Sequence, residues 1–149
     1  FDMVRLGIGL HGISATHANL QPVSSFKTYI SSIRNVPTDQ SIGYGRKSYT
    51  TRPSRIAVIP VGYADGLNRH LSNRVGNVFI KGKRVPIIGN ICMDTCMIDV
   101  TDTNATIGDE VEIFGKHILV TELSEQLGTI PYEILTGISH RVKRVYYKE

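Results

Sequence analysis

Short runs of apolar and β-branched residues, separated by Gly, Asn or Asp, dominate the chain from about residue 40 to residue 120. Such runs bounded by turn-forming residues are typical of β-strands. The clearest segments cover residues 55–61, 77–89, 95–100 and 109–115. The second segment is long enough for a hairpin that turns at Gly82. Short strands joined by tight turns predict a β-meander or a barrel, and the fold class is therefore mainly β.

Helical patterns occur only near the C-terminus. The segment VTELSEQLG predicts a helix with Thr121 as its N-cap and Gly128 as the stop residue after its end. The segment TIPYEILTGIS predicts a second short helix, with Thr129 or Ile130 as the cap and Pro131 in its first turn.

Two further strands are expected at the ends of the chain. Apolar residues alternate over residues 4–10, and RVKRVYY near the C-terminus has a similar pattern that would return to the sheet. The polar segment over residues 12–25 is interpreted as a crossing from the first strand into the barrel. Because that first strand has no lead-in, the sequence looks as though it were cut from a longer protein.

The composition allows one domain. The chain has 149 residues, 41% of them hydrophobic, which is enough for one well-buried core. It contains no long apolar stretch and no secretory leader, so we expect a cytoplasmic protein without a membrane partner. The formal net charge is +4, but Lys and Arg are spread along the chain without interleaved aromatic residues. This pattern disfavours nucleic acid as a partner, and a small barrel that binds nucleic acid or another anion is the alternative of a different class.

The cysteine and histidine residues give no sign of a disulfide or a metal site. Cys92 and Cys96 are four positions apart, which in a regular strand separates them by about 13 Å. That distance is too long for a disulfide, so we expect two buried thiols. The histidines show no ligand spacing and no cluster with the cysteines, and no metal is expected.

Two tyrosines stand on glycine hinges and are the first candidates for chemistry. Tyr44 lies between Gly43 and Gly45, and Tyr63 follows Gly62. Glycines let a turn hold an aromatic side chain in an exposed position where its hydroxyl meets a substrate. The alternative is that both tyrosines are ordinary packing residues of hairpins. Asp65 is interpreted as a turn former rather than a catalytic acid.

Three other short segments carry chemical groups. In VRLGIG, Arg5 precedes two glycines that leave backbone open to a ligand such as a phosphate, although an edge-strand arginine is an equal alternative. In GNICMDTC, Asp94 would be costly to bury without a partner. In TIPYEIL, Tyr132 lies near a helix N-terminus, where a phenol and backbone N–H groups can hold a phosphate.

In this order and spacing, these pieces resemble the C-terminal part of the bacterial alanine racemase family. The resemblance covers nearly the whole chain and is carried by MVRLGIGLHG, LQPVSSFKTYISSI, IGYGRKSY, RIAVIPVGYADGLNR, GKRVPIIGNICMDTCMIDVTD, GDEVEIFG and GTIPYEILTGISHRVKRVYYKE. It implies a C-terminal β-barrel-like domain with two short helices over residues 26–149. Residues 1–25 would be the last strand of an otherwise missing α/β barrel and the crossover.

The resemblance also implies an activity and a cofactor. Members interconvert L- and D-alanine by two-base proton transfer on a pyridoxal-phosphate aldimine, which supplies D-alanine for peptidoglycan. The lysine that anchors the cofactor is expected in the missing barrel, and Lys27 does not replace it. The isolated chain is therefore expected to be inactive.

Roles for individual residues follow from the same resemblance. Tyr44 matches the base on one face of the substrate, and the cofactor lysine is the base on the other face. Arg5 matches the arginine that donates to the pyridine nitrogen of the cofactor. Gly7, Ile8 and Tyr132 match positions that hold the cofactor phosphate.

Other residues match the surroundings of the substrate. Tyr63 and Tyr132 resemble the gate of the substrate entrance, and Arg69 resembles a residue of its outer passage. The backbone N–H of Met93 would meet the substrate carboxylate, and Asp94 would line the same site. The sites are expected to be shared between the two subunits of a homodimer.

One departure from the family bears on the site. Asn90 stands where many members have an arginine in the entry corridor, so the charge that attracts anionic ligands is expected to be reduced. An amino-acid racemase of broader specificity and a decarboxylase of related architecture are the nearest alternatives. The tyrosine pair Tyr44 and Tyr63 favours two-sided proton transfer over decarboxylation.

Overall fold

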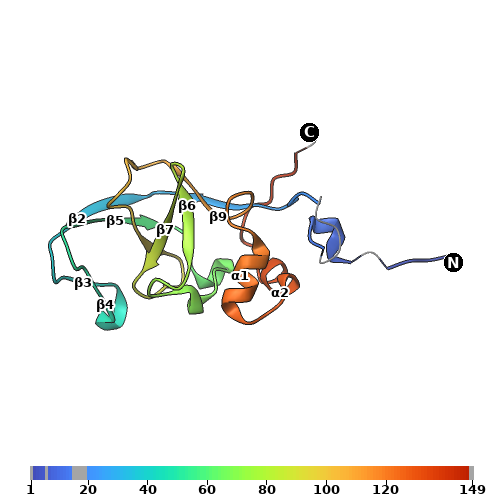
Figure 1. Cartoon of the computed structure of the whole chain (residues 1–149), viewed down its shortest axis with the longest axis horizontal. Helices are drawn as coiled ribbons and strands as arrows, with labels where there is room; N and C mark the ends of the chain where they lie inside the picture. The colour runs from blue at the N-terminus through green and yellow to red at the C-terminus, as the bar shows by residue number, and fades with distance from the viewer. Residues whose placement is uncertain (1, 6, 15–19, 148–149) are drawn as a thin grey trace.

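The computed structural model describes residues 2–5, 7–14 and 20–147 of the chain (Figure 1). Its strands are β1 Phe26–Tyr29, β2 Ser32–Val36, β3 Ser41–Ile42, β4 Ser48–Tyr49, β5 Ser54–Ile59, β6 Asn77–Ile80, β7 Lys83–Ile88, β8 Cys96–Asp99 and β9 Glu110–Phe114. The α-helices are α1 Val120–Leu127 and α2 Pro131–Thr136. The 3-10 helices are η1 Ile8–His11, η2 Tyr44–Arg46, η3 Tyr63–Asp65 and η4 Arg69–Leu71. Mainly β structure with two short helices confirms the predicted fold class.

Seven strands form one curled antiparallel sheet, in the order β1-β9-β6-β7-β8-β5-β2. The first and last strands of this order are neighbours in sequence, separated only by Ile30 and Ser31. The backbone N–H of Ile30 donates to Asp109 beside one edge, and that of Ser31 donates to Val58 beside the other. So short a connection brings both edges of the sheet together, which gives the barrel-like curl.

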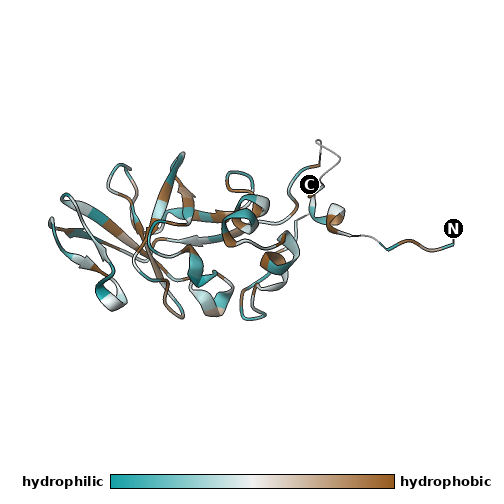
Figure 2. Ribbon diagram, turned by 60° about the horizontal axis from the view of Figure 1, so that its bottom comes forward, coloured by the Kyte–Doolittle hydropathy of each residue, from teal (hydrophilic) through white to brown (hydrophobic). Residues whose placement is uncertain are grey.

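The core lies inside this curl. Ile30 is fully buried, and the other large side chains of this core with almost no exposed surface are Ile59, Ile80, Ile87, Ile91, Ile98, Ile113, Ile118, Val78, Val100 and Val111. Ile88 is equally buried but packs with Ile42 and Ile56 in a second, smaller cluster. Figure 2 shows that apolar segments of the ribbon follow the strands of the sheet. β-branched side chains pack well on a pleated surface. The sheet curls around its own inner face, so the many isoleucines on that face favour this structure.

The predicted hairpin is confirmed by β6 and β7, which pair from Asn77 with Pro86 to Ile80 with Lys83. Lys81 and Gly82 connect them with positive φ values of 48° and 78°. Two central residues with positive φ form the turn that matches the twist of the flanking strands. The strands expected over 55–61, 95–100 and 109–115 are confirmed with small shifts of their ends by β5, β8 and β9.

The two helices pack beside each other at the end of the sheet where α1 and α2 are labelled in Figure 1. Leu123 of α1 and Ile134 of α2 are buried in the core. Gly128 ends α1 in the left-handed conformation, and α2 has Ile130 as its cap and Pro131 as its first residue, as expected. The prediction that Thr121 is the N-cap is wrong, because the helix begins at Val120 and Leu119 is the cap residue.

Both predicted terminal strands are absent from the described parts of the chain. Residues 2–5 have no regular secondary structure, Ile8–His11 form η1, and residue 6 lies outside the described residues. Residues 141–147 form no strand, and the side chains of Val145 and Tyr146 are exposed. An alternating sequence becomes a strand only where a neighbouring strand takes up its backbone N–H and C=O groups. Conversely, β1 and β2 were not expected as strands.

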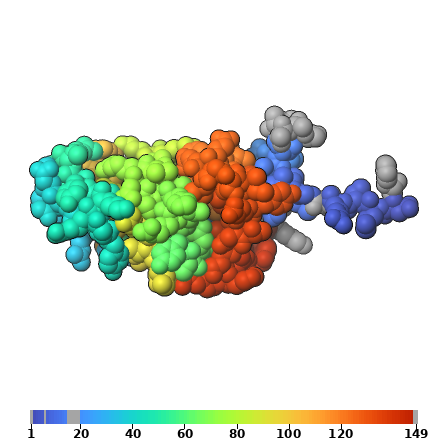
Figure 3. All heavy atoms as spheres, turned by 90° about the horizontal axis from the view of Figure 1, so that it is seen from below, coloured from blue at the N-terminus to red at the C-terminus, as the bar shows by residue number. Residues whose placement is uncertain are grey.

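The N-terminal segment extends away from the sheet at the end opposite the hairpin of β3 and β4 (Figures 1 and 3). The expected crossing over residues 12–25 lies partly in residues 15–19, which are outside the described part. Among the helices of the described residues, none is long and apolar enough to cross a membrane.

Candidate functional site

Tyr44 lies at the tip of a small hairpin. Strands β3 and β4 pair through Ser41 with Tyr49 and Ile42 with Ser48, and η2 connects them. Gly43 and Gly45 have φ values of 74° and 76°, which residues with a side chain rarely adopt. This turn leaves the Tyr44 side chain 78% exposed. Tyr44 is therefore presented outward on a glycine turn, as the sequence predicted.

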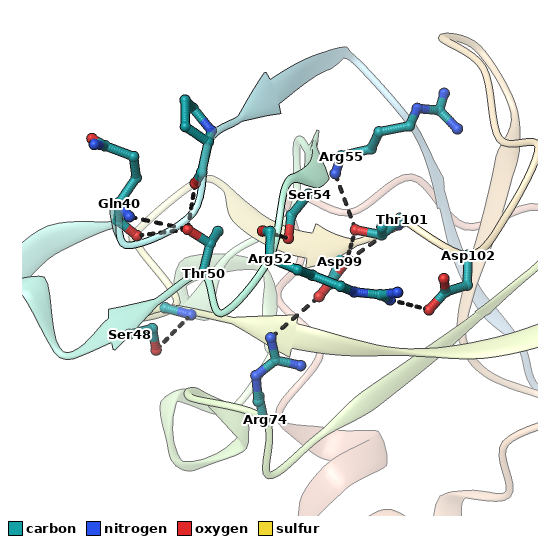
Figure 4. Close-up of polar contacts among 12 residues, drawn as sticks. Gln40, Ser48, Thr50, Arg52, Ser54, Arg55, Arg74, Asp99, Thr101 and Asp102 are labelled. Atoms are coloured by element: carbon teal, nitrogen blue, oxygen red, sulfur yellow. Dashed lines mark hydrogen bonds and ion pairs between the residues drawn. The ribbon is translucent and has the colours of Figure 1, made fainter.

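Thr50 fixes the base of this hairpin (Figure 4). Its buried hydroxyl donates to the Pro37 carbonyl oxygen at 2.6 Å and accepts from the Gln40 backbone N–H at 3.0 Å. The backbone groups of Thr50 also bond to Asp39 and Gln40 at 2.8 and 3.0 Å. These hydrogen bonds at Thr50 hold both ends of the hairpin together, so the base of the hairpin is fixed.

Tyr63 begins η3, a turn that docks on the loop between β7 and β8. The backbone N–H of Tyr63 donates to Cys92 and that of Ala64 to Met93, both at 3.0 Å. The Asp65 carboxylate accepts from the Gly62 N–H at 2.8 Å, which confirms Asp65 as a turn former. Tyr63 is therefore held against the segment that contains Met93.

Gly62→Ala is expected to lower the free energy of unfolding by about 1–3 kcal/mol, the cost typical of overpacking. A Cβ atom at this position would lie 2.3 Å from the carbonyl oxygen atoms of both Cys92 and Met93. Urea denaturation followed by circular dichroism measures the change. Gly9→Ala is the matched control, because a Cβ there meets nothing within 4 Å. Equal stability of the two variants would contradict the packing of η3 on the 92–93 segment.

The two tyrosine turns open on a shared groove of about 470 Å³. It is lined by Tyr44, Tyr63, Arg69, Asn90, Ile91, Cys92, Met93, Asp94 and Thr95. Five residues predicted from the sequence thus lie around one groove, namely Tyr44, Tyr63, Arg69, Met93 and Asp94. Phenol, guanidinium, carboxylate and backbone groups facing one space suit a small polar substrate.

Asp94 has the partner that its charge requires, although not for the expected reason. Its side chain is 61% exposed, so burial does not force the pairing. Arg141 donates from Nη2 to Asp94 Oδ1 at 2.5 Å and from Nε to Asp65 Oδ1 at 2.7 Å. Hydrogen bonds from the guanidinium to Asp65 and then Asp94 raise the pKa of Arg141 above its usual value. This arginine joins the η3 turn that carries Tyr63 to the loop that carries Asp94, and sequence reasoning missed it.

The remaining predicted residues form a second group, away from the groove. The hydroxyl of Tyr132 lies 2.9 Å from the point where a Cβ of Gly7 would be, so these two residues are neighbours. Ile8 begins η1, directly after Gly7. Arg5 is exposed in the N-terminal segment, at the opposite end of the molecule from the Tyr44 hairpin. Within one chain, the structure therefore does not bring Arg5, Gly7, Ile8 or Tyr132 to Tyr44.

The cysteines are both free, but they do not share one strand. Cys96 is buried in β8, whereas Cys92 lies in the preceding loop. Burial, with a smaller contribution from Cys92, raises the pKa of the Cys96 thiol to about 12. Cys96 is thus an unreactive core residue. Within the described ranges, no three His, Cys, Asp or Glu residues are grouped so that they could hold a metal ion.

Comparison with known proteins gives a consistent result. The family model described as alanine racemase, C-terminal domain, matches residues 23–146. The chain is 49% identical to alanine racemase 2 of Caldanaerobacter subterraneus subsp. tengcongensis, over 97% of the chain and 40% of that protein. It is 45% identical to alanine racemase of Methanococcus maripaludis, over 97% of the chain and 41% of that protein. The chain thus spans about two fifths of the length of these relatives.

Solved structures resemble the fold closely. The alanine racemase from Bartonella henselae with covalently bound pyridoxal phosphate matches with a TM-score of 0.89 and 38% identity, over 95% of the chain and 40% of that structure. The alanine racemase from D-cycloserine-producing Streptomyces lavendulae matches with a TM-score of 0.91 and 32% identity, over 100% of the chain and 42% of that structure.

Proposed function

Because the chain belongs to the family of alanine racemase C-terminal domains, we propose that it serves an enzyme that interconverts L- and D-alanine with pyridoxal phosphate. The observation that carries this proposal is Tyr44, which an anchored glycine turn presents at a groove beside Met93 and Asp94. A racemase removes the α-proton from one face of its substrate and returns it on the other. It needs a proton-transfer group on each face, and an exposed phenol at a fixed tip supplies one of them.

The second residue group fits the phosphate of the cofactor. Gly7 has no side chain where it faces the Tyr132 hydroxyl, and a side chain there would occupy the space beside that phenol. A phenol and backbone N–H groups at residues 7 and 8 are donors that suit a phosphate. The always-protonated Arg5 is the proposed donor to the pyridine nitrogen. When bound, pyridoxal phosphate draws electrons from the α-carbon and so makes its proton removable.

The groove residues bind and orient the substrate in this proposal. The Met93 backbone N–H meets the alanine carboxylate, and Tyr63 and Arg69 border the way in. Arg141 holds the loops of Asp65 and Asp94 together, and these loops carry Tyr63 and Met93. Tyr44 moves a proton between its phenolic oxygen and the α-carbon. The cofactor lysine of the barrel performs the same task on the opposite face.

The separation of the two residue groups supports a homodimer with shared sites. The hairpin of β3 and β4, which carries Tyr44, and the N-terminal segment lie at opposite ends of the described chain (Figures 1 and 3). We propose that the Tyr44 groove of one subunit faces the cofactor residues of the other, in a head-to-tail arrangement. The cytoplasmic location stays a prediction from the sequence.

The proposed function predicts D-alanine formation by the full-length enzyme and none by residues 1–149 alone, because the cofactor lysine lies outside this chain. Each protein is incubated with pyridoxal phosphate and L-alanine, and chiral chromatography measures the D-alanine formed. A panel of other L-amino acids tests for broader specificity. A full-length enzyme that binds the cofactor but decarboxylates its substrate, or leaves L-alanine unchanged, would refute the proposal. Turnover by the isolated chain would refute the assignment of the second base to the missing barrel.

A further inference from the structure

We propose that Asn90 is a positioning residue that fixes the main chain of Tyr44, an inference that rests on the proposed role of Tyr44 as a base. The sequence suggested only that Asn90 weakens the positive charge of an entry corridor. In the structure its carboxamide is directed to the Tyr44 turn, and the residue is only 9% exposed.

Asn90 links the Tyr44 turn to a second asparagine. Its Nδ2 donates to the Tyr44 carbonyl oxygen at 2.7 Å, and its Oδ1 accepts from Asn73 Nδ2 at 3.1 Å. A carbonyl oxygen only accepts, so the amide nitrogen of Asn90 must face Tyr44 and its oxygen must face Asn73. The orientation of the carboxamide is therefore determined by its partners, and no other side chain of the same shape offers both groups.

The link continues back into the hairpin. Asn73 Oδ1 accepts from the Ser48 hydroxyl at 2.8 Å, and Ser48 Oγ accepts from the Gly89 N–H at 3.2 Å. Figure 4 shows Ser48 on β4 and its hydrogen bond with the Gly89 backbone nitrogen. The Asn73 N–H also donates to the Gly89 carbonyl oxygen at 3.0 Å. The chain of bonds thus joins strand β4, the 73 turn and residues 89–90 to the carbonyl of Tyr44, and such connected networks are more rigid than single bonds.

Both glycines of the Tyr44 turn lie close to residue 90. A Cβ at Gly43 would lie 2.9 Å from the Met97 Cε atom and 3.4 Å from the Asn90 backbone nitrogen. A Cβ at Gly45 would lie 3.4 Å from Asn90 Nδ2. The backbone on both sides of Tyr44 therefore lies beside residue 90, and the close approach of Met97 is at Gly43 alone. The two glycines make the backbone of this turn flexible. The Asn90 bond holds the backbone of Tyr44, the residue between them.

Loss of this bond should affect proton transfer more than substrate binding. Thr50 still fixes the base of the hairpin, so the hairpin stays attached, but its tip gains freedom. A displacement of about 1 Å in a group that must meet the reacting atom can lower the rate about a hundredfold. Asn90→Asp has nearly the same shape and places an oxygen against the Tyr44 carbonyl oxygen. Asn90→Ala removes the donor without adding charge.

The first experiment measures the tip itself and does not depend on activity. Amide hydrogen exchange of residues 41–49 is followed by mass spectrometry in the isolated chain. Exchange should rise at least about threefold in Asn90→Asp and Asn90→Ala, because the hairpin opens more often when the bond to the Tyr44 carbonyl oxygen is lost. The matched control is Asn104→Asp, an exposed residue outside the groove, which should leave exchange unchanged. Unchanged exchange in both Asn90 variants would overturn the proposal, whatever the enzyme does.

The second experiment is a double-mutant cycle in the full-length enzyme. Asn90→Ala should lower kcat about tenfold or more and change KM less than about twofold. Asn90→Asp also adds a negative charge to the groove, so only its kcat is compared, and it should fall about tenfold or more. In the Tyr44→Phe background, they should lower the residual exchange of the alanine α-proton less than about twofold, because the residue they position has lost its function. An equal loss in both backgrounds would show a merely structural role and overturn the inference. If Tyr44→Phe itself has no effect, the base assignment of the proposed function fails first, and the positioning role fails with it.

Discussion

Tyr44→Phe in the full-length enzyme is expected to lower the rate of racemisation about a hundredfold to ten-thousandfold, the range typical of a lost general acid or base. The substitution removes only the phenolic hydroxyl, and the side chain is 78% exposed, so the fold has little to lose. Cofactor binding should be unaffected, because the proposed cofactor residues Gly7 and Tyr132 lie in the other group. A coupled assay of D-alanine formation and the absorbance of the bound cofactor measure the two effects separately.

In Tyr44→Phe, the rate of α-proton exchange should fall much more for one enantiomer of alanine than for the other. If the proposed roles hold, loss of the Tyr44 hydroxyl leaves the barrel lysine able to exchange the α-proton of the enantiomer that presents its proton to the lysine. Deuterium uptake from solvent should therefore persist for one enantiomer and stop for the other. Tyr49→Phe is the matched control, because Tyr49 is an exposed tyrosine of the same hairpin and does not line the groove. Racemisation within about threefold of the unsubstituted enzyme would contradict the role of Tyr44 as a base, since a general base contributes far more.

Local signals were sufficient to predict the strands in the middle of the chain. The hairpin of β6 and β7 needs only β-branched runs and the Lys81–Gly82 turn, all of which are adjacent in sequence. The end strands of the sheet, β1 and β2, were missed because their sequences, FKTY and SIRNV, are short and mix polar and charged residues with few apolar ones. The alternating RVKRVYY segment gave the opposite error, since no neighbouring strand pairs with it in the described residues. Alternation shows which residues could be buried on one face of a strand. Whether the segment forms a strand depends on a neighbouring strand that pairs with its backbone.

The candidate site shows the same division. Tyr44 and Tyr63 were recognisable because their glycines are adjacent, and the resemblance to a family supplied Met93 and Arg69. The residues that connect these groups, Arg141 among them, come from distant segments and carry no local motif. Arg141 bridges Asp65 and Asp94 across sequence separations of 76 and 47 residues. Sequence reasoning could state that Asp94 needs a partner, but only the folded chain identifies which arginine it is.

Mixing two inactive variants of the full-length enzyme is expected to restore activity. One variant lacks the Tyr44 hydroxyl and the other lacks the cofactor lysine. If each site takes Tyr44 from one subunit and the lysine from the other, a heterodimer has one site with both groups and one site with neither. Random exchange of subunits makes about half of the dimers heterodimers, so the mixture should recover about a quarter of the unsubstituted activity. The recovered rate should rise and saturate with the time allowed for subunit exchange.

This recovery tests the shared site directly, because each variant alone has no site with both groups. Heterodimers are isolated through two different affinity tags, and circular dichroism confirms that both variants are folded. The control mixture contains the Tyr44→Phe variant and a double variant that has both Tyr44→Phe and the lysine substitution. Neither subunit of this mixture has an intact Tyr44, so it should stay inactive. The separation of the Tyr44 hairpin from the N-terminal segment within one chain is the structural reason to expect complementation. Verified heterodimers without activity would mean that Tyr44 acts on a cofactor bound to its own subunit, and the barrel would then have to fold back towards its own groove.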